Sequence, residues 1–289
     1  MKVRKAVIPA AGWGTRFLPA TRAFPKELLS LVNKPVIQYA VEEALASGIG
    51  QIIVVISPFT NAIRDYFRPH PELAALLRSR GNGELADEME RLDRMADIIY
   101  VVQPERRGLG HAVLMAKEVV GMEPFAVILP DDVIDAREPA LAQMLRVFDS
   151  RQAGVVAVEN IDRSEIGRYG VVRTETVAPR LHRVLSLVEK PEPAKAPSRL
   201  GIVGRYILTP QIFEVVESIP PGSGGEIQLT DALSVLLKRQ GLYALEFDGR
   251  RFDTGSPPGW IEAQAAFGMK NQDYGEALRE KLRQLTSYE

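Results

Sequence analysis

The sequence predicts an α/β fold in which helices flank a Rossmann-like, mixed but mainly parallel central sheet. The first observation is an apolar run at residues 6–8, a helical pattern after Pro35, and a β-branched run at 51–56. This order of strand, helix and strand predicts a right-handed parallel crossover. The second observation is that these strands are continuous apolar runs, which is typical of parallel strands buried on both faces. The third is composition, because 46% apolar and 25% charged residues are ordinary for a globular domain with a large core.

The first half of the chain continues this alternation of strands and helices. Further strands are predicted at residues 98–102, 125–129 and 154–158, and further helices at 110–120 and 138–148. Residues 61–96 interrupt the alternation, since they are polar and rich in Leu, Glu and Arg. Leu85, Met89 and Leu92 recur there at helical spacing, so we expect a helical insertion.

The second half has strands with a more alternating pattern and fewer helices between them. Strands are predicted at residues 171–173, 183–188, 202–208 and 242–247, and helices at 226–239, 257–269 and 274–285. No internal repeat or low-complexity linker separates the two halves. The sequence therefore predicts one catalytic domain over residues 1–265, with the insertion at about 61–96, and a helical tail at 266–289.

Charge and composition exclude several classes of function. The formal net charge is -1, so no overall basic field exists to attract nucleic acid or an anionic membrane. The chain has no cysteine, which excludes disulfides, thiolate nucleophiles and Cys-ligated metals. No run approaches the ~20 apolar residues of a membrane span, and the N-terminal apolar run is too short for a signal peptide. We expect no nucleic-acid or membrane partner and a cytoplasmic location.

The first predicted strand leads into a loop that contains Gly12, Gly14 and Arg16. Two glycines let backbone N–H groups approach an oxyanion, and an arginine adds a fixed charge with bidentate geometry. The dinucleotide fingerprint is excluded because Phe17 stands where its third glycine would be. With Lys26 as a second cation the loop predicts phosphate binding, although ordinary turns also contain such glycine pairs.

Polar residues end several predicted strands, where ligands bind to α/β sheets. Gln103 offers an amide donor and acceptor that match the imide edge of uracil or thymine, although a polar turn before a helix explains it equally well. Asp131 and Asp253 suit Mg²⁺, which takes one or two carboxylates together with phosphate oxygens. Each aspartate alone is also compatible with a helix cap or turn. Glu189 and Lys190 could meet sugar hydroxyls and a phosphate, but a lone Glu-Lys pair is uninformative.

These motifs together resemble the bacterial UTP–glucose-1-phosphate uridylyltransferases of the sugar-nucleotidyltransferase superfamily. The matching segments, in order from about residue 5 to 265, are Ala10-Ala11-Gly12-Trp13-Gly14-Thr15-Arg16-Phe17-Leu18-Pro19-Ala20-Thr21, Pro25-Lys26-Glu27, Gly108-Leu109-Gly110-His111-Ala112-Val113, Leu129-Pro130-Asp131-Asp132, Val188-Glu189-Lys190-Pro191, Val203-Gly204-Arg205-Tyr206 and Gly224-Gly225-Glu226-Ile227-Gln228-Leu229-Thr230-Asp231. The insertion at 61–96 also resembles this family rather than its shorter thymidylyl relatives. Departures from the expected pattern are Trp13 for a smaller aliphatic residue, Arg22 for lysine, Ser30 for proline and Asn33 for aspartate.

The resemblance implies the nucleotidyltransferase fold, Mg²⁺ as cofactor and a role for each matching residue. It implies catalytic roles for Arg16, Lys26 and Lys190, and metal binding by Asp131 and Asp253. It implies nucleotide binding by Ala10, Ala11, Gly12, Gly14, Thr15, Gln103 and Gly108. It implies sugar-phosphate binding by Gly170, Glu189, Lys190 and Gly204.

The implied reaction joins UTP and glucose 1-phosphate into UDP-glucose and pyrophosphate. Two alternatives remain open at the level of sequence: a dTTP-dependent thymidylyltransferase, and a non-catalytic sugar-nucleotide-binding regulatory subunit. Gln103 does not separate UTP from dTTP, because uracil and thymine share one imide edge and a methyl is worth only ~1–3 kcal/mol. The family also implies a homo-oligomer, either a dimer or a tetramer.

Overall fold

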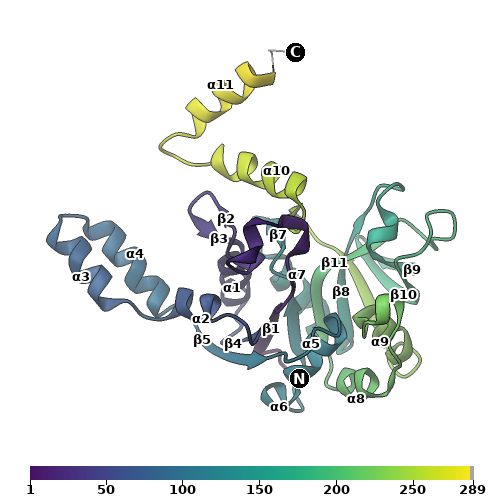
Figure 1. Cartoon of the computed structure of the whole chain (residues 1–289). Helices are drawn as coiled ribbons and strands as arrows, with labels where there is room; N and C mark the ends of the chain where they lie inside the picture. The colour runs from purple at the N-terminus through teal and green to yellow at the C-terminus, as the bar shows by residue number, and fades with distance from the viewer. Residues whose placement is uncertain (287–289) are drawn as a thin grey trace.

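The computed structural model describes residues 1–286, and a nine-stranded mixed sheet forms its centre (Figure 1). In order across the sheet the strands are β5 (Asp97–Val102), β4 (Gln51–Ile56), β1 (Lys5–Ala10), β6 (Phe125–Ile128), β11 (Leu200–Leu208), β8 (Gly154–Asn160), β12 (Leu242–Glu246), β10 (Leu181–Glu189) and β9 (Gly170–Ala178). The prediction of an α/β fold with a mixed central sheet is confirmed.

The parallel part of the sheet brings the predicted ligand-binding strand ends together. Strands β5, β4, β1 and β6 are mutually parallel, so their carboxyl ends lie at one edge. The register pairs Ala10 with Ile56, and Ile56 with Val102, so β1, β4 and β5 end level with one another. In the second half β8 and β12 are parallel, and the other neighbouring pairs of the described sheet are antiparallel.

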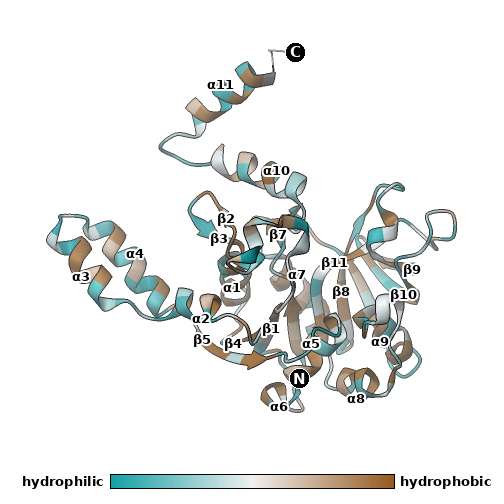
Figure 2. Cartoon of the chain, viewed as in Figure 1, coloured by the Kyte–Doolittle hydropathy of each residue, from teal (hydrophilic) through white to brown (hydrophobic). Residues whose placement is uncertain are grey.

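Two apolar clusters cover the two faces of the sheet, as alternating strand side chains require. Val7 of β1 lies in one cluster, whereas Ala6 and Ile8 lie in the other. The first face packs against α5 (Leu109–Met115), α8 (Gln211–Ser218) and α9 (Leu229–Leu236), and the second against α1 (Val36–Ala46) and α7 (Ala140–Arg151). Figure 2 shows hydrophobic colour concentrated on the central strands. This core fixes the strand ends from which the site is built.

Two helical segments extend away from this body in Figure 1. The predicted insertion is helical, as α2 (Ala62–Phe67), α3 (Pro71–Ser79) and α4 (Gly83–Asp93). At the other end, α10 (Pro257–Gly268) leads to α11 (Gly275–Thr286), so the predicted boundary between residues 265 and 266 falls inside α10. The division into a domain and a tail stays a prediction. Within the described residues no helix is both long enough and apolar enough to span a membrane.

Several elements differ from the sequence prediction. The helix predicted at 110–120 is divided at Ala116 into α5 and α6 (Lys117–Val120). The helix predicted at 226–239 is shorter, because α9 begins at Leu229, after the extended Gln228, and ends at Leu236. Strand β9 is much longer than the predicted 171–173.

Other elements were not predicted. They are α8, β2 (Ser30–Leu31), β3 (Lys34–Pro35), β7 (Asp132–Asp135) and β13 (Arg250–Asp253). The last two pair with each other in a separate antiparallel ribbon. Both are short and carry charged residues, so they lack the continuous apolar pattern that marked the central strands. Its register pairs Asp132 with Asp253, so it brings the predicted metal ligand Asp253 close to the turn that carries Asp131.

Candidate functional site

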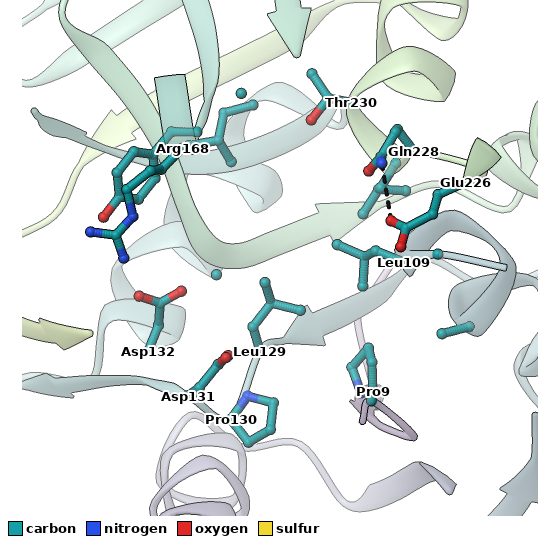
Figure 3. A pocket seen from close by; sticks show the side chains of 18 of the residues that line it. Pro9, Leu109, Leu129, Pro130, Asp131, Asp132, Arg168, Glu226, Gln228 and Thr230 are labelled. Carbon is teal, nitrogen blue, oxygen red and sulfur yellow. Dashed lines mark hydrogen bonds between the residues drawn. The ribbon is translucent and has the colours of Figure 1, made fainter. Parts of the chain in front are cut away.

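A cavity of about 740 Å³ opens at the carboxyl ends of the parallel strands and extends along β9, β10 and β11. It brings together twelve of the fifteen residues that have a predicted role. These are Ala11, Gly12, Arg16, Lys26, Gln103, Gly108, Asp131, Gly170, Glu189, Lys190, Gly204 and Asp253. Figure 3 shows the aspartates beside Leu129 and Pro130 on one side of the cavity, with Glu226, Gln228 and Thr230 on another.

Ala10, Gly14 and Thr15 lie outside the cavity lining. Ala10 is the buried last residue of β1, and Thr15 begins a short 3-10 helix, Thr15–Phe17. Gly14 has φ of +62°, and a Cβ there would lie 3.2 Å from the Cβ atoms of Lys26 and Thr21. A side chain at Gly14 would therefore be strained and crowded. These contacts suggest that Gly14 packs the loop against the Lys26 segment.

The Arg16 guanidinium links the glycine loop to the turn after β13. Its Nη1 donates to the carbonyl of Gly255 at 2.9 Å. Gly255 in turn lies against both predicted metal ligands, because a Cβ there would meet Asp131 Oδ2 at 2.6 Å and Asp253 Oδ1 at 3.1 Å. Residues that are far apart in the sequence thus converge on one small region.

Gln103 and Gly108 form the end of the cavity assigned to the base. The Gln103 side chain is buried and lies 3.0 Å from Nδ1 of His111. Burial, with the nearby Arg107, lowers the pKa of His111, so a neutral ring can accept from the Gln103 amide. Gly108 has φ of +95°, and a Cβ would lie 2.9 Å from the carbonyl oxygen of Ile227. Packing against Ile227 therefore requires this glycine, whether or not a base also lies there.

The two predicted metal ligands each face a cation. Lys26 Nζ donates to Asp131 Oδ2, and Arg168 Nη2 lies 2.6 Å from Asp253 Oδ2. Burial opposes the charge on Asp131, but Lys26 and Arg16 hold the pKa of this carboxyl below its usual value. Asp131 is therefore an anion at neutral pH.

Two close carboxylates fit Mg²⁺, which completes its shell with phosphate oxygens and water. Residues 1–286 contain no group of three or more acidic or histidine side chains that could hold a metal without such a substrate. The donor set thus suits a metal that arrives with, or is completed by, a phosphate ligand.

A network of charged side chains contacts the turn formed by Asp131 and Asp132. Arg251 Nη1 lies 2.5 Å from Asp132 Oδ1, its Nε lies 2.7 Å from Glu159 Oε2, and its Nη2 donates to the Tyr169 hydroxyl. Although burial opposes the charge, these carboxylates raise the pKa of Arg251. Gly204 packs against this network, because a Cβ there would lie only 2.5 Å from Asp132 Oδ2. The structure therefore places Gly204 against Asp132.

Arg205 anchors the same turn from inside the core. Its side chain is 1% exposed and forms an ion pair at 2.8 Å with Glu43 of α1. Its Nη1 donates to the carbonyl of Leu129 at 3.0 Å, and its Nη2 donates to that of Asp132 at 2.7 Å. These two carbonyls flank Asp131, so Arg205 fixes the backbone that presents the predicted metal ligand.

Glu189 and Lys190 lie at the far end of the cavity, where β10 ends. Lys190 Nζ is 3.3 Å from Glu189 Oε1, and the lysine side chain is 46% exposed. A Cβ on Gly170 would meet Glu189 Oε2 at 3.2 Å and Thr230 Oγ1 at 2.7 Å. Glu189, Lys190 and Gly170 therefore form one group, as expected for a shared ligand.

Several lining residues had received no role from the sequence. Those that are charged or aromatic are Trp13, Glu27, Arg106, Asp132, Arg168, Tyr169, Tyr206, Glu226 and Arg251. Arg168 is labelled beside the aspartates in Figure 3. Four of them stood within matching motifs: Glu27, Asp132, Tyr206 and Glu226. Trp13 was noted as a departure, so each of these five carried a signal without an assigned role. Arg106 and Arg168 carried no signal, because an isolated arginine in a loop is usually solvated.

Comparison with known proteins gives similarity over the whole length. A family model described as nucleotidyl transferase matches residues 5–269. A UTP–glucose-1-phosphate uridylyltransferase of Bacillus subtilis (strain 168) is 44% identical over 277 residues, which are 96% of this chain and 95% of that protein. A solved UTP-bound UGPase from Acinetobacter baumannii has a TM-score of 0.90 and 36% identity, covering 98% of this chain and 99% of that one. A UDP-glucose pyrophosphorylase complexed with UDP-glucose has a TM-score of 0.85 and 40% identity, covering 93% and 100%.

Proposed function

The chain belongs to the nucleotidyl transferase family, and within it to the UTP–glucose-1-phosphate uridylyltransferases, and from this membership we propose the reaction that it catalyses. It transfers the uridylyl group of UTP to α-D-glucose 1-phosphate, giving UDP-glucose and pyrophosphate. The observation that supports this most strongly is the single cavity that contains Gln103 at one end, Glu189 and Lys190 at the other, and Arg16 and Asp131 among its lining residues.

In the proposed reaction a phosphate oxygen of glucose 1-phosphate attacks the α-phosphorus of UTP. A new oxygen–phosphorus bond forms, and the bond to the bridging oxygen breaks, so that pyrophosphate leaves with its electron pair. The nucleophile is already an anion at neutral pH and needs no general base. The barrier is mutual repulsion between two polyanions, so positioning and positive charge carry the catalysis.

The side chains of this cavity suit those two tasks. Arg16 and Lys26 supply positive charge near the glycine loop, and Lys190 supplies it beside Glu189. Gln103 offers the donor and acceptor pair for the uracil, and the Glu189 carboxylate accepts from sugar hydroxyls. Asp131 and Asp253 would hold Mg²⁺, which when bound adds positive charge to the phosphate oxygens.

A matrix of nucleoside triphosphates against sugar 1-phosphates, with pyrophosphate release as readout, tests the proposal. We expect the highest kcat/KM with UTP and glucose 1-phosphate. A higher kcat/KM with dTTP would favour the thymidylyltransferase alternative. Binding of the nucleotide without pyrophosphate release would favour the regulatory alternative.

Two further expectations stay predictions: the cytoplasmic location and the homo-oligomeric state. Apolar side chains on the extended C-terminal helices support self-association, because Ile261 is 61% and Leu285 is 68% exposed. Light scattering on the full chain distinguishes the proposed dimer or tetramer from a monomer. A monomer at the concentrations used for activity assays would contradict this part of the proposal.

A further inference from the structure

The cations that line the cavity differ in whether a carboxylate neutralises them. Four of them form ion pairs: Lys26 with Asp131, Arg168 with Asp253, Lys190 with Glu189, and Arg251 with Asp132. Within residues 1–286, the remaining lining cations, Arg16 and Arg106, form no ion pair with a carboxylate. A polyanionic ligand is attracted most by cations whose charge is not already neutralised. Arg16 has an assigned role, whereas Arg106 does not.

Arg106, in the loop after β5, is held in one orientation by contacts from two other loops. Its Nε donates to the carbonyl of Ala11 at 2.7 Å, and its Nη2 donates to Ser57 Oγ at 2.8 Å. The guanidinium carbon lies 3.6 Å from the centre of the Trp13 ring and 5.1 Å from that of Phe59. These residues follow the carboxyl ends of β1, β4 and β5, so Arg106 joins the three loops at the nucleotide end of the cavity.

The aromatic pair that supports Arg106 is itself unusual for a protein surface. Trp13 and Phe59 are stacked with centroids 6.3 Å apart, yet they are 66% and 73% exposed. The guanidinium lies on the Trp13 face, which favours a cation and restricts its rotation. In the described residues Nη1 of Arg106 makes no hydrogen bond, so its N–H groups remain available to a ligand. A pre-oriented, unpaired guanidinium is suited to bidentate binding of phosphate.

We infer that Arg106, oriented by Trp13, binds the β- and γ-phosphates of UTP in the forward reaction and pyrophosphate in the reverse reaction. This inference rests on the proposed function and adds Arg106 to the residues that bind the phosphates of the nucleotide. The Arg106 guanidinium has only hydrogen-bond donors, so it cannot pair with both the donor and the acceptor on the edge of uracil. The Gln103 amide has one of each and can make both bonds. Arg106 also lies on the glycine-loop side of the cavity, whereas Lys190 lies at the sugar-phosphate end. Arg106 therefore contributes to nucleotide binding and not to glucose 1-phosphate binding.

Steady-state kinetics on Arg106→Gln, Arg106→Lys and Trp13→Leu test the inference. For Arg106→Gln we expect the KM for UTP and the KM for pyrophosphate to rise about tenfold, because a charge-assisted hydrogen bond is lost. The KM for glucose 1-phosphate and kcat should change less than about twofold. Arg106→Lys keeps the charge but not the bidentate geometry, so an intermediate KM is expected, and Trp13→Leu should raise the UTP KM about threefold.

Arg64→Gln is the matched control, since it removes the same charge from an exposed arginine outside the cavity lining whose guanidinium carbon also lies near an aromatic ring, 5.5 Å from the centre of Tyr100. Equal effects of Arg64→Gln and Arg106→Gln would overturn the inference, as would unchanged KM values for UTP and pyrophosphate. Calorimetric titration with UTP and with UMP identifies the bound part of the nucleotide. Loss of UTP affinity with unchanged UMP affinity supports the inference, whereas equal losses would assign Arg106 to the base, the ribose or the α-phosphate and overturn it. Wild-type turnover in the same assay tests the proposed function separately, because the titrations do not depend on turnover.

Discussion

The two ends of the cavity are built on different electrostatic principles. At the nucleotide end the ligand groups are glycine-loop backbone and the unpaired guanidinium groups of Arg16 and Arg106. At the proposed metal and sugar-phosphate end the charges occur in pairs, such as Arg168 with Asp253 and Lys190 with Glu189. The nucleotide end is therefore ready for a polyanion. At the other end a metal or phosphate must replace an existing partner.

This difference agrees with the ligand that we propose for each end. The phosphates of UTP bring their own negative charge, so the nucleotide end needs cations without carboxylates. A metal-binding end needs carboxylates, and buried carboxylates without a partner are costly. Neighbouring lysine and arginine side chains lower that cost until the ligands arrive. The nucleotide end is thereby preformed, and we expect the metal end to rearrange its ion pairs.

The largest effect is expected where the carboxylate end is anchored in the core. Arg205→Met leaves Glu43 buried without its partner and releases the carbonyls of Leu129 and Asp132. We expect a loss of about 4 kcal/mol in the free energy of unfolding, measured by urea denaturation. Lys34→Met is the control, because its pair with Glu42 is 30% and 36% exposed and contributes at most about 1 kcal/mol. Equal losses in the two variants would show that the buried pair is not an anchor.

A second large effect concerns Glu27, a lining carboxyl that is 2% exposed and whose Oε2 has no hydrogen-bond partner in the described residues. Burial raises its pKa to about 7, with Lys26 opposing the shift. An acid whose folded pKa exceeds its unfolded pKa loses stabilisation as pH rises between the two values. From pH 4.5 to 7, wild type should therefore lose about 3 kcal/mol of stability relative to Glu27→Gln.

Urea denaturation of both proteins at pH 5 and pH 8 measures this difference. Glu72→Gln, at an exposed position of α3, serves as the control and should show no such pH dependence relative to wild type. Parallel stability–pH curves for wild type and Glu27→Gln would show that Glu27 titrates normally. Glu27 is therefore expected to be neutral at low pH, whereas Lys26 and Arg16 lower the pKa of Asp131 and keep it ionised.

The central strands could be predicted because each is a continuous run of apolar residues. The strand predicted at residues 51–56 is confirmed with the same bounds, since β-branched residues fill all of its central positions. The ribbon of β7 and β13 was missed because Asp132, Asp135, Arg250 and Arg251 make it charged rather than apolar. Its position depends on tertiary contacts with the cavity, which no local pattern records.

The residues of the site divide in the same way, because several within sequence motifs were predicted, whereas those brought together only by folding were not. Asp131, Glu189 and Lys190 follow strands within family motifs, so the resemblance pointed to them, and all three line the cavity. Arg106 and Arg168 are single arginines in loops, and only folding shows that one rests on Trp13 and the other faces Asp253. Sequence reasoning therefore identified residues that repeat across a family motif and missed partners supplied by the fold.

Lys190 tests the sugar-phosphate end of the comparison. Lys190→Ala should lower kcat by about 100-fold, because one stabiliser of transition-state charge is lost. The protein should remain folded, since this side chain is 46% exposed and its partner Glu189 can be solvated through the cavity. Lys195→Ala is a matched control, because that lysine is 73% exposed and pairs only locally with Glu192. Near-normal turnover of Lys190→Ala would remove it from the catalytic group.

The smallest effect is expected at Asp253, where the two ends of the cavity are compared most directly. Asp253→Asn removes one proposed metal ligand and leaves Arg168 paired with Glu165 alone, at little cost to stability because Arg168 is 42% exposed. We therefore expect the half-saturating Mg²⁺ concentration to rise about tenfold, with an unchanged urea midpoint. Asp135→Asn on the same ribbon removes only a surface pair with Lys270 and should leave the metal titration as in wild type. If Asp253→Asn also left it unchanged, Asp253 would be a structural partner of Arg168, and the carboxylates at this end would not be explained by metal binding.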